Sequence, residues 1–146
     1  MDRKLRILNE NAHTENKWVD WCIIAFKNIY GYEWQGDNLL LARKNLFYTF
    51  VDYYENKFKR IPEKNLQKKI AEIISWNLWQ MDGVKFVIPN SCHAESDAQI
   101  SMFGKTKVLE CLGCRNGNIK EHNGIYCKIK NWETNKAVKF INFFEK

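Results

Sequence analysis

The cysteine and histidine residues of this 146-residue chain are concentrated in one short stretch. The first 91 residues contain only His13 and Cys22. The stretch from residue 92 to residue 127, in contrast, contains six such residues: Cys92, His93, Cys111, Cys114, His122 and Cys127. Thiolates and imidazoles are the ligands that zinc prefers in structural sites. Their concentration in a loop-rich segment predicts that a zinc ion stabilises the fold of that segment.

Cys111 and Cys114 form a Cys-x-x-Cys motif with Gly113 inside it. A glycine at this place permits the tight turn in which two thiolates face one metal ion. One alternative is a thioredoxin-like redox motif, which requires a helix after the second cysteine, whereas residues 115–123 are turn-like. The other alternative is that the thiols are unrelated to one another. The clustering favours the metal site.

Six candidates compete for the four positions of a tetrahedral site. Cys92 lies in a predicted loop and His122 precedes an Asn-Gly turn, so both are free to point toward a metal ion. Cys127 alternates with two isoleucines and is equally compatible with a core position. We predict the ligands Cys92, Cys111, Cys114 and His122, with Cys127 as the substitute for His122 and His93 as a further option. Four protein ligands leave no open position for water, so this zinc is expected to be structural.

Apolar residues recur at helical spacing in three segments of the N-terminal half. These segments are residues 15–29, residues 37–59 and a third helix that Pro62 opens and that extends to Leu78. Short connections between them predict a three-helix core within residues 1–83. Thr14 and Asp37 are the predicted N-caps of the first two helices, and the helical spacing places both Trp18 and Trp21 in the core. Cys22 lies on the same apolar stripe and is predicted to be an inert core thiol.

The C-terminal part has the alternation and the turns that are typical of short strands. The predicted strands are residues 84–88, residues 107–110 and a hairpin formed by residues 125–130 and 137–144 around a turn at 133–135, while residues 90–99 are predicted to be a loop. The expected fold class is therefore α+β. It has a helical core (1–83) and a zinc-stabilised module with a small antiparallel sheet (84–146), packed together as one compact domain.

The net charge of +6 is concentrated near the C-terminus. Residues 105–146 contain nine Lys and Arg against four Asp and Glu, whereas residues 1–104 are nearly balanced. Such a basic segment indicates an anionic partner, either an acidic protein surface or nucleic acid. A Lys-rich composition from an AT-rich genome is the alternative explanation. We predict that Lys128, Lys130 and Lys139, together with an exposed Trp76, form a partner-binding surface.

No known catalytic arrangement is evident in the sequence. We find no Ser-His-Asp pattern and no glycine-rich loop of the kind that binds phosphates, and Glu33, Asp37 and Asp82 are not paired by spacing. The expectation is a protein without enzymatic activity and without catalytic residues. Residues 1–11 lack the apolar stretch of a signal peptide, and no run is long enough to span a membrane. Five cysteines are then expected as thiols in a reducing bacterial cytosol, with no membrane partner.

One segment, Ile29-Tyr-Gly-Tyr-Glu-Trp-Gln-Gly-Asp-Asn followed by a helix with Ala42-Arg43, resembles a part of DNA adenine methyltransferases of restriction–modification systems. The resemblance implies that Glu33 ends a strand and holds the ribose of S-adenosylmethionine. It also implies that Asp82, in Trp79-Gln-Met-Asp-Gly, contacts the adenine of this cofactor. Phage and plasmid members carry a similar cysteine-rich insertion, and the likeness covers roughly residues 15–140.

Two motifs of that family are missing from this sequence. The glycine-rich cofactor loop is not found before residue 15, and the Asn/Asp-Pro-Pro-Tyr/Phe motif that holds the flipped adenine is not found after the last strand. We therefore expect no methylation by this chain alone. In kind and size, though not in a matched motif, the chain also resembles small anti-CRISPR proteins of type II-A systems, among which is a zinc metalloprotein. The favoured function is an inhibitor that binds a type II CRISPR effector nuclease and blocks DNA loading or cleavage; the alternative is a nucleic-acid-binding remnant or subunit of a methyltransferase.

Overall fold

A computed structural model describes residues 1–93, 95–96 and 108–144. Parts of three expected segments lie outside the described residues: residues 94 and 97–99 of the predicted loop, Lys107 of a predicted strand and residues 145–146 of the predicted C-terminal module. Within the described residues the fold class is α+β, as the sequence predicted. Helices dominate the first 77 residues, and short strands follow them.

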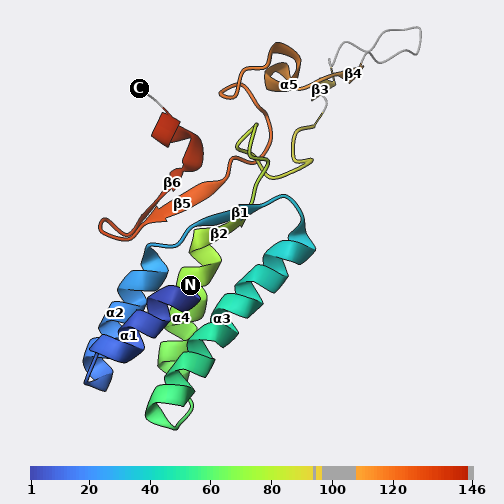
Figure 1. The fold of residues 1–146 in the computed structure, drawn as a ribbon. Helices are drawn as coiled ribbons and strands as arrows, with labels where there is room; N and C mark the ends of the chain where they lie inside the picture. The colour runs from blue at the N-terminus through green and yellow to red at the C-terminus, as the bar shows by residue number, and fades with distance from the viewer. Residues whose placement is uncertain (94, 97–107, 145–146) are drawn as a thin grey trace, which may run out of the picture.

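Four helices, not three, form the N-terminal half (Figure 1). They are α1 (Asp2–Asn11), α2 (Glu15–Lys27), α3 (Gly36–Phe58) and α4 (Lys64–Asn77). The sequence analysis missed α1 because this helix buries only Leu5 and Leu8 among many charged residues. Both leucines nevertheless join the main hydrophobic cluster, since α1 contacts both α2 and α3.

The helix ends differ in part from the predictions. Thr14 does cap α2, because its hydroxyl accepts a hydrogen bond from the backbone N–H of Lys17. Helix α3 begins before Asp37, with Gln35 as its N-cap, and α4 begins only at Lys64, after Pro62. Asp37 and Pro62 are residues that often begin helices, but in this protein they lie one turn or less from the observed start.

Trp18 lies at the centre of the helical core. It is completely buried and packs edge-on against Tyr54 and Phe58, with ring centroids 5.6 and 5.7 Å apart. Its indole N–H donates to Asn9 Oδ1 at 2.6 Å, which satisfies its one polar atom. The prediction for Trp21 was wrong. This side chain is 37% exposed, and the ammonium group of Lys17 lies 4.7 Å from its ring.

A short parallel pair of strands lies at one end of the helices (Figure 1). It consists of β1 (Gly31–Glu33) and β2 (Leu78–Gln80), with Glu33 opposite Gln80. Helices α3 and α4 form the crossover between the two strands, as parallel pairing requires. Periodicity did not reveal this pair because each strand has only three residues.

The C-terminal part contains β3 (Glu95–Ser96), β4 (Val108–Leu109), α5 (Leu112–Asn116), β5 (Lys128–Asn131), β6 (Lys136–Lys139) and the 3-10 helix η1 (Phe140–Phe144). Strands β3 and β4 pair antiparallel, and so do β5 and β6. The loop predicted at residues 90–99 was therefore wrong at Glu95–Ser96, where pairing with β4 forms a short strand that polar residues do not signal. The predicted hairpin is present as β5 and β6. Its first strand begins later than the apolar alternation suggested, and its second strand ends where η1 begins.

The strand predicted at residues 84–88 does not form. The carboxylate of Asp82 accepts the backbone N–H groups of Val84 and Lys85 at 2.9 and 3.1 Å, which turns the chain instead of extending it. Phe86 adopts a positive φ of 59°, and only Val87 forms a bridge, to Tyr126. Local hydrogen bonding to an Asp side chain thus overrides the strand preference of the valines.

Polar contacts join the hairpin to the helical half. The indole N–H of Trp132 donates to Asn77 Oδ1 at 2.9 Å, and Lys130 Nζ lies 3.4 Å from Glu72 Oε1. Asn77 is itself buried, and its amide donates to the C-terminal carbonyls of α2. None of the described helices is long and apolar enough to cross a membrane.

Candidate metal centre and adjoining pocket

The structure brings together the four residues that the sequence analysis selected as metal ligands. The ligand atoms of Cys92, Cys111, Cys114 and His122 all lie within 4.8 Å of one another. The three Sγ atoms lie 3.6, 3.7 and 3.6 Å from His122 Nδ1. We call these four residues the Cys3His cluster. Cys127 and His93, the two substitutes, are not members of it.

The spacing within the Cys3His cluster can be compared with that of a zinc tetrahedron. Zinc–sulfur bonds of about 2.3 Å and a zinc–nitrogen bond of about 2.0–2.1 Å, at tetrahedral angles, place sulfur and nitrogen about 3.6 Å apart. The three observed distances agree with this value. The cluster is therefore compatible with a zinc site in which His122 coordinates through Nδ1.

Gly113 shapes the Cys-x-x-Cys turn. A Cβ atom at this position would lie 2.6 Å from the backbone nitrogen of His122 and 2.8 Å from the carbonyl oxygen of Asn118. The missing side chain therefore allows the segment that carries His122 to pass directly against the turn. The backbone N–H of Gly113 donates to Glu121 O at 3.2 Å, which holds the two segments together.

A second contact aligns the loop of Cys92 with the loop of His122. The side-chain amide of Asn123 accepts from the backbone N–H of His93 at 3.3 Å and donates to its carbonyl at 2.8 Å. Gly124 lies against the same loop, because a Cβ there would be 2.6 Å from Ser91 Oγ. Sequence reasoning noted Asn123-Gly124 only as a turn. Its role in joining two metal-binding loops depends on contacts across 30 residues.

The electrostatics of the thiols differ within the Cys3His cluster. Burial opposes ionisation of Cys111, but the backbone N–H groups of Asn123, Cys114 and Gly113 and the ring of His122 lower the pKa of its thiol to about 6. The N–H of Asn123 lies 3.3 Å from Cys111 Sγ. Burial and the neighbouring thiols raise the pKa of Cys92 to about 11. Cys111 is thus surrounded by N–H donors that favour the thiolate form, the form that binds a metal ion.

The remaining cysteines are buried core residues. Cys22 is 1% exposed, and burial raises the pKa of its thiol strongly. Cys127 is completely buried, and its thiol donates to Gln80 O at 3.1 Å. Burial raises the pKa of Cys127 to about 11. Of the two interpretations open for Cys127, the structure supports the core thiol.

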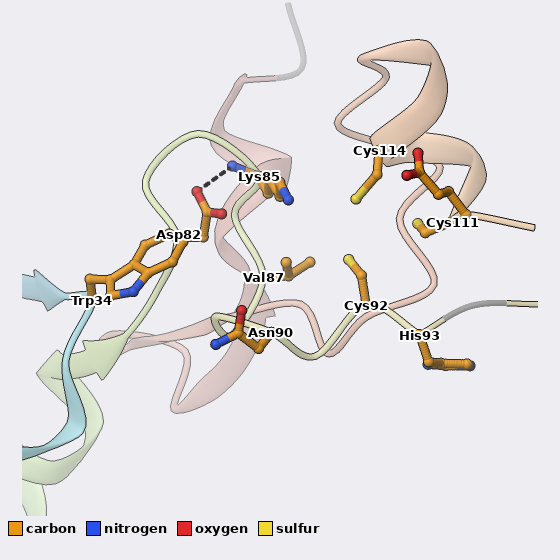
Figure 2. Close-up of a pocket in the computed structure, with 10 residues that line it drawn as sticks. Trp34, Asp82, Lys85, Val87, Asn90, Cys92, His93, Cys111 and Cys114 are labelled. Carbon is orange, nitrogen blue, oxygen red and sulfur yellow. Dashed lines mark hydrogen bonds between the residues drawn. The ribbon is translucent and has the colours of Figure 1, made fainter.

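A pocket adjoins the Cys3His cluster (Figure 2). Its volume is about 350 Å³, and its lining includes Trp34 and Asp82 on one side and Cys92, Cys111 and Cys114 on the other. Asp82 is only 5% exposed, whereas Trp34 is 50% exposed. Figure 2 shows the three cysteine side chains pointing toward a common centre while His93 points away.

Glu33 and Asp82 lie at the same edge of the β1–β2 pair. Glu33 is the last residue of β1, and its backbone carbonyl accepts the N–H of Met81 directly after β2. Asp82 follows immediately. Sequence spacing did not pair these acids, because 48 residues separate them and only the parallel pairing of the strands brings them to one edge. The carboxyl edge of parallel strands is where ligands bind in open α/β sheets.

The predicted partner-binding residues divide into two groups. Lys128 and Lys139 are exposed and lie directly opposite each other in the hairpin. Lys130 contacts the rings of Trp76 and Trp132 at 5.3 and 4.5 Å from the centroids, and its side chain is only 12% exposed. The expectation of an exposed Trp76 was wrong, since the ring is half-buried beneath Lys130.

Comparisons with protein-family models, with curated proteins and with solved structures found no match to this chain. A proposal for its function therefore rests on the chemistry of its sites.

Proposed function

We propose that this chain is a zinc-containing, cofactor-binding part of an S-adenosylmethionine-dependent DNA adenine methyltransferase of a restriction–modification system. The observation that carries the proposal is the parallel pairing of β1 with β2. This pairing puts Glu33 and Asp82 at one carboxyl edge. These are the two acids to which the sequence resemblance assigns the ribose and the adenine of the cofactor.

The surroundings of both acids suit an adenosyl group. Glu33 Oε1 accepts the backbone N–H of Gln35 at 3.0 Å, which fixes the carboxylate and leaves its other oxygen for ribose hydroxyls. Two backbone N–H groups fix Asp82 Oδ1 in the same way, so this carboxylate can accept a hydrogen bond from an amine. The indole of Trp34, the residue after Glu33, lines the pocket together with Asp82 and offers an exposed flat surface for a purine.

Calorimetric titration of the purified, metal-loaded chain with S-adenosylmethionine tests this proposal. We expect saturable binding to the wild type and at least about a tenfold loss in Glu33→Gln, because a hydrogen bond to a charged group contributes about 1.5–3 kcal/mol. Asp52→Asn is the matched control, since Asp52 is exposed on α3. Absence of binding at millimolar cofactor, or equal binding by Glu33→Gln, would overturn the proposal.

Methyl transfer is expected to need further residues. The printed sequence contains neither the glycine-rich cofactor loop nor the motif that holds a flipped adenine. We therefore propose that the chain binds the cofactor and DNA together with a polypeptide that supplies both motifs, and that alone it is not an enzyme. Transfer of a labelled methyl group to DNA by the purified chain alone would contradict this.

For the Cys3His cluster, we propose one structural zinc ion. The agreement of three sulfur–nitrogen distances with a tetrahedron supports it. Four protein ligands would complete the coordination shell, and zinc would supply the free energy that holds three loops together. Elemental analysis is expected to find about one zinc per chain in the wild type and in Cys127→Ser, and to find a loss in Cys114→Ser. Loss of zinc in Cys127→Ser with retention in Cys114→Ser would reverse the assignment.

A second candidate function is inhibition of a type II CRISPR effector nuclease in the bacterial cytosol. The exposed, directly opposed Lys128 and Lys139 favour it, because like charges placed opposite each other cost stability and suit an acidic partner. The same surface could contact the phosphates of DNA. The dependence of binding on salt concentration distinguishes a DNA partner from a protein partner. Inhibition at physiological salt without binding to free DNA supports the inhibitor. Tight DNA binding with a steep salt dependence and no effect on the nuclease excludes it.

A further inference from the structure

The pocket beside Asp82 and the Cys3His cluster are two parts of one structure. Asp82 and Trp34 line one side of the cavity, and three of the four cluster residues line the other. The metal-binding loops are therefore not a remote appendage. They form a wall of the space in which the proposed cofactor site lies.

Backbone contacts connect Asp82 to the cluster through a short path. The backbone N–H of Asp82 donates to Val87 O at 2.8 Å, and Val87 bridges to Tyr126. The hydroxyl of Tyr126 accepts the backbone N–H of His122 at 3.0 Å. The chain then continues from Val87 to Cys92. This segment is therefore connected to the Cys3His cluster at its start, through Tyr126 and His122, and at its end, by Cys92 itself.

Lys85 makes the most direct connection. Its backbone N–H donates to Asp82 Oδ1 at 3.1 Å, and its side chain points toward Cys114 (Figure 2). Both Lys85 and Cys114 line the pocket. Three thiolates and one neutral imidazole around Zn²⁺ carry a net charge of −1. Lys85 therefore joins an anionic metal centre to the turn that positions the buried carboxylate.

We propose that occupancy of the Cys3His cluster controls the affinity of the adjoining pocket for adenosyl ligands. This inference rests on the proposed cofactor function. Without the metal ion, the three loops are joined only through single hydrogen bonds such as those of Asn123 with His93 and Cys111 in the described residues, and we expect the far wall of the pocket to separate from Asp82. With the metal ion bound, Lys85 and the Asp82 turn are held in place.

Linkage makes the proposal measurable in both directions. If zinc raises the affinity for S-adenosylmethionine by a given factor, the ligand raises the affinity for zinc by the same factor. The test is a zinc competition against a chromophoric chelator, with and without saturating S-adenosylmethionine, in reducing buffer. We expect at least about a tenfold increase in zinc affinity with the ligand, and the same loss of ligand affinity in the zinc-free chain.

Lys85→Met separates coupling from unfolding, because it retains most of the side chain and every metal ligand. We expect zinc content equal to wild type and a coupling factor reduced several-fold, whereas Lys136→Met, an exposed change on β6, leaves it unchanged. Equal ligand affinity with and without zinc would overturn the inference and leave the cofactor proposal intact. Absence of S-adenosylmethionine binding by the zinc-loaded chain would overturn both.

Discussion

Helices α1–α4 and the segment from residue 108 to residue 144 are stabilised in different ways. All buried members of the main hydrophobic cluster lie between Leu5 and Leu78, and several are large side chains such as Trp18 and Phe50. In the later segment, the buried residues among those described are Cys111, Gly113, His122, Cys127 and Ile141. Two of these five belong to the Cys3His cluster, and one is a glycine. Apolar burial therefore stabilises the first region, whereas the second depends on cross-links between loops.

This difference predicts that each region can be perturbed with little effect on the other. Contacts between them include the Trp132–Asn77 hydrogen bond, the Lys130–Glu72 pair and the packing of the Trp132 ring against the hydrophobic cluster. A change in the metal cluster is expected to act on the pocket and the C-terminal loops. A change in the helical core is expected to act on the unfolding of the helices.

The largest effect is expected from loss of a metal ligand. Cys111→Ser should release the metal and remove a stabilisation on the order of 10 kcal/mol from the C-terminal loops, as in small zinc domains. Amide hydrogen exchange should then become fast around residues 111–127 and remain slow in α2 and α4. Cys127→Ser is the control, since a hydroxyl can still donate to Gln80 O. Loss of protection in α2 together with the loops would contradict the independence of the two regions.

Trp18→Ala tests the opposite direction. Removing this fully buried ring should cost about 3–5 kcal/mol in the unfolding of the helices. Trp21→Ala, at a site 37% exposed, should cost far less. Chemical unfolding followed by far-UV circular dichroism measures both values. The metal content per folded chain should equal that of the wild type in both variants, and a metal loss in Trp18→Ala would show that the core and the cluster are coupled.

Gly113→Ala should weaken metal binding without removing a ligand. The added Cβ would lie 2.6 Å from the backbone of His122, so the segment must move away from the turn. We expect a 10- to 100-fold lower zinc affinity, the range found when groups that orient metal ligands are changed. Gly117→Ala is the control, because its Cβ would meet no atom within 4 Å and only its positive φ of 66° causes strain. Equal affinities in the two variants would contradict the close approach.

Lys130→Ala should cost about 1–2 kcal/mol. Its ammonium group lies over Trp76 and Trp132, and the side chain is 12% exposed, so cation–π contacts are partly shielded from water. Lys128→Ala, at an exposed position of the same strand, should change stability by less than about 0.5 kcal/mol. The free energies from urea unfolding decide between a structural and a partner-binding role for Lys130.

The smallest effect concerns the pH dependence of the helical half. Hydrogen bonds from Tyr54 and Arg60 lower the pKa of Glu15 below its usual value. A lowered folded-state pKa stabilises the protein above the unfolded-state pKa, and this contribution disappears as the pH falls through the folded-state pKa. Between pH 5 and about pH 3, Glu15→Gln should therefore lose less stability than the wild type. The free energy of unfolding is measured by urea at several pH values for both proteins. Release of a bound metal ion at low pH would affect both proteins alike, so a difference between their slopes of unfolding free energy against pH is due to Glu15.

Part of the fold could be predicted from local pattern. The stripes around Trp18, Phe50 and Ile70 predicted α2, α3 and α4, because burying one helix face requires apolar residues at that spacing. Helix α1 escaped prediction because two leucines are too few to define a face. The strand predicted at residues 84–88 failed because the side chain of Asp82 hydrogen-bonds the backbone into a turn.

The members of the Cys3His cluster were also predictable, for a related reason. Few residue types bind zinc, and they were concentrated in one segment, so the choice lay among six side chains. The structure then distinguished Cys127, a buried thiol that donates to Gln80 O, from Cys92, a member of the Cys3His cluster. The orienting contacts of Gly113 and Asn123 left no such signal, since glycine and asparagine are common in ordinary turns.

The sequence by itself determined the helical stripes, the hairpin and the set of metal-ligand types, because each depends on the chemistry or spacing of neighbouring residues. The tertiary structure alone decided which distant groups meet. The pairing of β1 with β2 brings Glu33 and Asp82 to one edge, and Asn77, a polar residue on an apolar stripe, becomes the acceptor for Trp132 and a donor to α2. Such contacts follow from the path of the whole chain, which three-residue strands and single amides do not specify in their local sequence.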